Sequence, residues 1–222
     1  MSSVADGLVT SNESKTAPIQ ARIDGAIEDL LASLPHPGQL SAEERRGIIA
    51  RYTAVLEGNF IYWMTGAYIS VGSDDARAKI MDNLREEVRD CHPGMMRRFA
   101  LAAHAIPTDA DAQAVHRNLM NVRLFIGRLS PVPTVVTMAF FEGFIQRFMP
   151  YLAELALRQG SAEMEYTDVH GVCDVTHTQE LFRALDAEMA LERPLPEKEM
   201  FEGVELLRAL IQNIVVNNVA NN

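Results

Sequence analysis

Long segments with the apolar spacing of α-helices, separated by short breaks, run through most of this 222-residue sequence. The breaks contain proline, glycine or helix-capping residues; Ser41 and Glu44, for example, form a capping box that opens a long helix over residues 41–70. Strand signals are scarce, because no Asn-Gly or Asp-Gly turn lies between alternating segments. The sequence therefore predicts an all-α chain of about seven helices packed as an up-down bundle.

A single domain accounts for this pattern. The first 17 residues, rich in Ser, Thr, Gly and Asn, are expected to form a disordered N-terminal arm. Residues 18–222 then form one helical domain, and a hydrophobic content of 48% is sufficient for one sizeable core. The third predicted helix, over residues 76–105, is expected to be distorted near His92, because Pro93 disfavours the helical conformation at the residue before it.

Composition excludes several classes of protein. A formal net charge of −10 opposes sequence-independent binding to nucleic acid or to anionic lipid, since both require clustered Lys and Arg. Two cysteines, Cys91 and Cys173, are too few for a disulfide framework and fit a reducing cytosol. No apolar run reaches the roughly 18 residues needed to span a bilayer, and the first residues lack the features of a signal peptide. We expect a soluble, cytoplasmic protein that binds neither membrane nor nucleic acid.

Two histidines and an aspartate share one face of a predicted helix. In "EYTDVHGVCDVTHTQELF", His170, Asp174 and His177 follow one another at intervals of four and three residues, which places them on one side of a helix. Val172 and Cys173 on the flank make a solvated polar face less expected. This spacing favours a metal-binding face.

Two further helices carry a lone carboxylate in an otherwise apolar stripe, Glu57 on one and Glu142 on the other. Two buried ionised carboxylates would each cost several kcal/mol unless cations or strong donors met them, and neither stripe contains Lys or Arg. A metal would resolve this excess of negative charge, and His92 on the third helix is the natural additional nitrogen ligand.

The candidate metal ligands are six: Glu57, His92, Glu142, His170, Asp174 and His177. Three carboxylates and three imidazoles are ligands typical of iron or manganese, whereas a closed zinc site would use thiolates. Six ligands divided between two ions leave positions for water, dioxygen or substrate, so the set indicates a dinuclear centre in the bundle core. A ferritin-like site is disfavoured, because no histidine has a glutamate three residues before it.

This arrangement resembles the haem-oxygenase-like diiron oxidase and oxygenase family. The resemblance rests on "VLEGNF", "DCHPGM", "FFEGFI" and the closing "HGVCDVTH", and it covers most of residues 40–190. It implies a seven-helix haem-oxygenase-like fold without haem, two iron ions as cofactors, and O2 as co-substrate. Some N-oxygenases of the family add a seventh carboxylate from the helix of the first histidine. Glu86 and Glu87 are the candidates here, although both lie off the face of His92 on an ideal helix.

The resemblance implies oxidation of a small-molecule substrate, and we expect N-oxygenation of an amine to a hydroxylamine, nitroso or nitro product in a biosynthetic pathway. Oxidative C–C cleavage or decarboxylation of an amino or fatty acid would use the same metal ligands. A metal-free relative of the thiaminase or cofactor-synthase type and a metal-storage protein are further alternatives. An external electron donor and a homodimer are compatible with these expectations, and the sequence fixes neither.

Overall fold

A computed structural model describes residues 16–191 and 193–216. Apart from its last two residues, the predicted arm 1–17 lies outside this described part. The described residues form nine α-helices and a short 3₁₀ helix, with no strand, so the all-α prediction is confirmed. In order, the elements are α1 (Ala17–Ala32), η1 (Pro37–Gln39), α2 (Ala42–Ser70), α3 (Asp74–Arg89), α4 (His92–Ala102), α5 (Asp109–Ile126), α6 (Pro131–Arg158), α7 (Glu165–Met189), α8 (Glu197–Met200) and α9 (Glu202–Val216).

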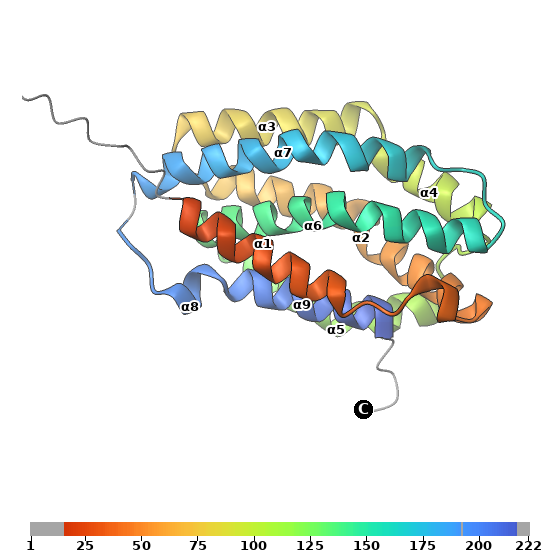
Figure 1. The fold of residues 1–222 in the computed structure, drawn as a ribbon. Coiled ribbons are helices and arrows are strands. Elements are labelled where there is room, and N and C mark those ends of the chain that lie inside the picture. Colours follow the sequence, from red (N-terminus) through yellow and green to blue (C-terminus); the bar gives the residue numbers. More distant parts are fainter. Residues whose placement is uncertain (1–15, 192, 217–222) are drawn as a thin grey trace, which may run out of the picture.

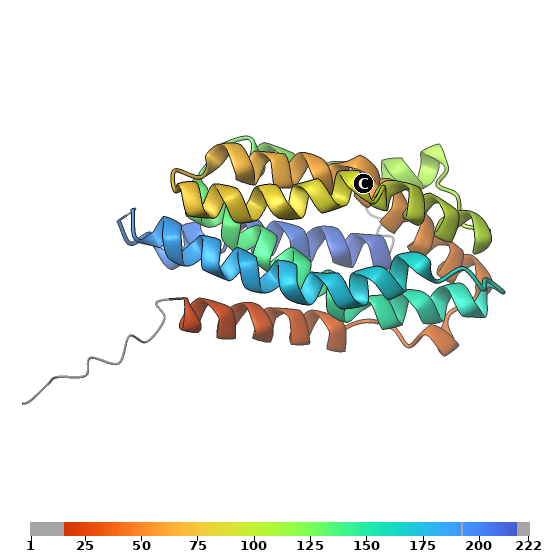
Figure 2. The same ribbon diagram turned by 90° about the horizontal axis from the view of Figure 1, so that it is seen from above.

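The long helices lie side by side in an elongated bundle around α6 (Figure 1). Every residue from 132 to 145 on α6 is buried, so this helix is surrounded by others for half its length. Its largest contact is with α7, and α2, α9 and α1 pack on its other sides. Both views show α3 lying beside α7 on one side of the bundle (Figures 1 and 2). The apolar core therefore sits between α6 and the helices that enclose it.

The predicted capping box opens α2. The Ser41 side chain accepts a hydrogen bond from the Glu44 N–H, and the Glu44 side chain accepts one from the Ser41 N–H. A second capping box, formed by Thr108 and Asp111, opens α5. These caps fix where α2 and α5 begin.

The helix count differs from the predicted seven because two predicted helices are each divided. The predicted third helix ends at Arg89 and begins again at His92, since Cys91 adopts the left-handed conformation with φ of 56°. The distortion thus falls where Pro93 led us to expect it. The final segment is also divided, because a turn at Phe201, with a φ of −102°, separates α8 from α9.

The predicted long helix over residues 41–70 is also interrupted. Glu57 and Gly58 have non-helical backbone angles, and Gly58 has a φ of 88°, a conformation that glycine adopts without strain. Residues on the two sides of this kink therefore do not share a continuous helix face.

None of the described helices combines the length and apolar character needed to cross a membrane.

Candidate metal centre

Three buried side chains meet where α3, α4 and α7 come together. Glu87 comes from the last turn of α3, His92 begins α4, and His170 lies on α7. The Oε1 atom of Glu87 lies 2.7 Å from Nδ1 of His92 and 3.9 Å from Nε2 of His170. One ligand atom from each of the three lies within 4.8 Å of the others, so a single ion could bind all three. We call Glu87, His92 and His170 the first ligand group.

The α7 backbone orients His170. Its Nδ1 lies 2.8 Å from the carbonyl oxygen of Tyr166, one turn earlier, and donates a hydrogen bond to it. This leaves Nε2 directed toward Glu87. Burial lowers the pKa of His170, although the charges of Asp174 and Glu87 oppose this shift, so the imidazole is kept neutral. A neutral imidazole whose second nitrogen is anchored by a carbonyl is the form that ligates metals.

A second group lies one turn further along α7. The Nδ1 atom of His177 is 3.6 Å from Oδ1 of Asp174 and 3.8 Å from Oε1 of Glu142, which comes from α6. All three residues are buried. On the other edge of the ring, Nε2 of His177 lies 3.0 Å from Oε2 of Glu86. The thiol of Cys173 donates a hydrogen bond to Oδ1 of Asp174, 3.2 Å away. We call Glu142, Asp174 and His177 the second ligand group.

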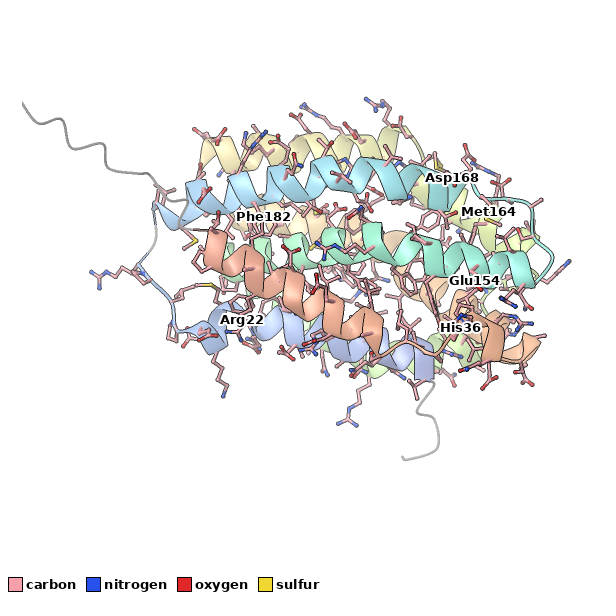
Figure 3. The ribbon with its side chains drawn as sticks, viewed as in Figure 1. Arg22, His36, Glu154, Met164, Asp168 and Phe182 are labelled. Atoms are coloured by element: carbon pink, nitrogen blue, oxygen red, sulfur yellow. The ribbon has the colours of Figure 1, made fainter. Side chains whose placement is uncertain are left out.

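The two histidine ligands of α7 lie, along the chain, between residues that the side-chain view labels. In Figure 3, Met164 and Asp168 mark the end of α7 nearest α4, and Phe182 lies toward the opposite end. His170 and His177 fall between these labels in the sequence, in the part of α7 that lies beside α3 and α6. The two ligand groups are therefore neighbours in the interior of the bundle.

Two residues of the second ligand group, Glu142 and His177, have raised pKa values. Burial, together with the negative charge of Asp174, raises the pKa of Glu142 well above its ordinary value. Burial alone would lower the pKa of His177, but the neighbouring carboxylates of Asp174, Glu142 and Glu86 raise it to about 10. Both shifts favour the protonated form, because the interior here is desolvated and gathers several carboxylates.

Unsatisfied polar atoms in this region fit a bound cation. Within the described part of the chain, Oδ2 of Asp174, Nδ1 of His177 and Oδ1 of Asn83 are buried and make no hydrogen bond. Each buried polar atom without a hydrogen bond lowers the stability of the fold by about 1–3 kcal/mol, so three of them around one site need an explanation. A metal bound by Asp174 and His177 would satisfy two of them directly. The donor set of carboxylates and imidazoles suits iron.

A small cavity of about 20 Å³ opens onto the ligands. Five ligand residues line it: Glu87, His92, Glu142, His170 and Asp174. The rest of its wall is mainly apolar and is formed by Leu56, Phe60, Ile61, Pro93, Met96, Phe141, Ile145 and Tyr166. A volume of this size holds a water molecule or a diatomic gas.

Five of the six predicted ligands come together in these groups, and Glu57 does not. The expected burial of Glu57 was wrong, because its side chain is 25% exposed and forms an ion pair with Arg97. Two physical reasons explain the error. The kink at Gly58 interrupts the apolar stripe, and the compensating cation comes from α4 rather than from the same helix.

Glu87 takes part in the first group instead. It is 4% exposed, whereas the sequence indicates it only as an alternative to Glu86 for a seventh ligand. Its position relative to His92 depends on the left-handed residue Cys91, which the sequence alone did not reveal. Asn83, one turn before Glu87, was missed altogether, because a buried asparagine has no distinctive sequence pattern.

Comparison with known proteins agrees with this geometry. Residues 49–210 match a haem-oxygenase-like family described as iron-containing redox enzymes, and this span includes every residue of both ligand groups. No curated protein matches the chain. Because the match covers well over half of the 222 residues, the chain belongs to the haem-oxygenase-like family of iron-containing redox enzymes.

Proposed function

We propose that this protein is a non-haem diiron oxygenase that uses O2 to oxidise a small metabolite, most simply by N-oxygenation of an amine. The observation that carries the proposal is the pair of ligand groups buried in one bundle, the second of which contains two polar atoms without a hydrogen bond, Oδ2 of Asp174 and Nδ1 of His177. The alternative of a metal-free enzyme gives no reason to bury so many carboxylates without cations.

The first ion would be held by Glu87, His92 and His170, and the second by Glu142, Asp174 and His177. Glu86, which contacts the outer edge of His177, stands close enough to join the second ion or to orient its histidine. Three protein ligands per ion leave open positions at both. Two bound iron ions would supply the redox chemistry that activates O2.

The chain itself would bind the substrate and exclude water. Leu56, Phe60, Phe141 and Ile145 form an apolar wall beside the ligands, so bulk water has little access to the reacting atoms. The hydrogen bond from His170 to Tyr166 would keep that ligand fixed during turnover. The cavity of about 20 Å³ has room for O2 beside the ligands.

The proposal is tested by reconstituting the metal-free protein with Fe(II) under anaerobic conditions, counting bound iron and then adding O2. We expect about two irons per chain and rapid O2 consumption. His177→Ala and Glu142→Ala should abolish O2 consumption and lose at least the second iron, whereas His116→Ala, on the exposed side of α5, should behave as wild type.

Products from candidate amines and acids then separate the reactions. N-oxygenated products support the proposed reaction, and release of an alkene or aldehyde without them favours oxidative C–C cleavage or decarboxylation. A chain that binds iron without consuming O2 would be a storage protein. A chain that binds no iron would refute the diiron proposal and favour a metal-free enzyme.

A further inference from the structure

The amide of Asn83 makes a short hydrogen bond inside the site. Asn83 lies on α3 and is 4% exposed, and its Nδ2 donates to Oε1 of Glu142 over 2.6 Å. We infer that Asn83 is a positioning residue, which holds the Glu142 carboxylate in the orientation needed to bind the second metal ion. This inference rests on the proposed diiron function and adds to it a residue that does not itself ligate metal.

Asn83 is the one hydrogen-bond donor to Glu142 among the described residues. Glu142 stands on α6 and is 2% exposed, with apolar residues before and after it on the cavity wall. No Lys or Arg of the described residues lies within 4.0 Å of its carboxylate, and His177 at 3.8 Å is too distant for a hydrogen bond. The orientation of this buried carboxylate therefore depends on a single amide.

The bond engages one oxygen of Glu142 and leaves the other available. Its Oε2 makes no hydrogen bond within the described residues, and Glu142 lines the cavity together with Asp174. Hydrogen bonds to ligating carboxylates are a general means of fixing their rotamers in metal sites. Asn83 would thus set which oxygen of Glu142 faces the ion.

The chemistry of an amide suits this role better than that of a cation. Lys or Arg at the same place would neutralise Glu142 and repel an incoming metal ion, whereas the neutral amide orients the carboxylate and leaves its charge for the metal. The same helix turn supports the assignment, because Glu87 follows Asn83 by four residues and lies on the same face of α3. One short segment of α3 therefore supports both ions.

A purely structural role explains the geometry less well. Buried asparagines that serve packing alone normally satisfy both ends of the amide, but Oδ1 of Asn83 is buried without a partner among the described residues. The chain tolerates this unsatisfied carbonyl while it keeps the bond to Glu142. Such a cost is typical of functional sites.

The test is an anaerobic titration of the full metal-free chain with Co(II), whose visible absorption reports the coordination of each ion. We expect Asn83→Leu, which is similar in size but has no donor, to weaken binding of the second equivalent roughly 10- to 100-fold and to change its spectrum. The first equivalent should bind as in wild type. Asn83→Gln, which keeps an amide donor, should recover part of the lost affinity.

The matched control is Asn118→Leu. Asn118 donates through Nδ2 to the carbonyl of Ala209 over 3.2 Å and so links α5 to α9 away from the ligand groups. This variant should lower the unfolding midpoint without changing either Co(II) affinity. Thermal unfolding of each metal-free variant, measured in parallel, separates loss of stability from loss of metal orientation.

Wild-type Co(II) affinities and spectrum in Asn83→Leu would overturn the inference while leaving the diiron proposal intact. Equal weakening of both equivalents would also overturn it, because that result indicates general damage to the bundle. If the wild-type chain binds no cobalt, the proposed function itself fails, whatever the variants do.

Discussion

Nδ1 of His92 lies 2.7 Å from Oε1 of Glu87, although the two residues are on different helices and only five positions apart. On an ideal helix, side chains five residues apart point about 140° away from each other. The break at Asp90 and Cys91, where the chain passes through the left-handed region, turns His92 back toward Glu87. The interruption of this helix is therefore part of how the first ligand group is built.

Glu87 should matter for iron binding far more than Glu57. Glu87→Gln is expected to lower the iron bound per chain to about half, because the first group then loses its one carboxylate. Glu57→Gln removes an ion pair with Arg97, whose side chain is 71% exposed, and such surface pairs contribute about 0–1 kcal/mol. Metal analysis after anaerobic reconstitution measures both effects.

The same two variants also test which glutamate is a metal ligand, Glu57 as predicted from the sequence or Glu87 as inferred from the structure. If Glu57→Gln loses as much iron as Glu87→Gln, Glu57 is a ligand in the loaded protein, as the sequence alone predicted. Normal iron content in Glu87→Gln would remove Glu87 from the first group.

The left-handed conformation of Cys91 should cost stability that glycine would recover. Its φ of 56° brings Cβ close to the backbone, and a non-glycine residue pays about 1–2 kcal/mol for this conformation. Cys91 is exposed, so its side chain contributes little packing. Cys91→Gly should raise the free energy of unfolding by about 0.5–1 kcal/mol in urea denaturation. Cys91→Ala keeps a Cβ and should show no such gain; equal stability of the two variants would mean that this backbone is unstrained.

The helices could be predicted because local signals define them. The Ser41 capping box, the scarcity of strand signals and the apolar stripe of α6 all depend on residues close together in sequence. The motif from His170 to His177 was recognisable for the same reason, since its ligands lie on consecutive turns of one helix.

The remaining features depend on contacts between distant segments or on a backbone conformation that the residue types do not specify. The partner of Glu57 is Arg97, 40 residues away on another helix, so inspection of its own stripe gave no sign of a cation. Glu87 reaches His92 only through a change in backbone conformation at Cys91. Asn83 acquires its role from Glu142, 59 residues later.

Asp111 should stabilise the fold in a pH-dependent way. Burial raises the pKa of Asp111, but hydrogen bonds from Thr108 and Arg46 outweigh this effect and hold the pKa below its ordinary value. A carboxyl whose pKa is lowered by folding stabilises the protein above its unfolded-state pKa of about 4, and this contribution disappears as the pH falls through the folded-state value. Asp111→Asn should therefore cost about 2 kcal/mol near pH 7 and progressively less below about pH 4.

Urea denaturation at a series of pH values measures this difference. Asp109→Asn, at the exposed neighbouring position in the first turn of α5, is the control and should show a small loss at neutral pH. A gap between wild type and Asp111→Asn that stays constant down to the lowest pH would contradict a lowered pKa for Asp111.

The packing of α9 should depend on the absence of a side chain at Gly203. A Cβ atom built at this position would overlap Oγ1 of Thr137 on α6 and the ring of Phe125 on α5, so α9 approaches both helices too closely for alanine. Gly203→Ala is expected to lower the free energy of unfolding by about 1–3 kcal/mol, because the overpacked helix must shift.

Gly25 provides a matched control, since a Cβ there meets nothing within 4 Å. Gly25→Ala should stabilise α1 by about 0.5–1 kcal/mol through helix propensity. If both substitutions instead raise the unfolding midpoint, α9 does not make the close approach described here.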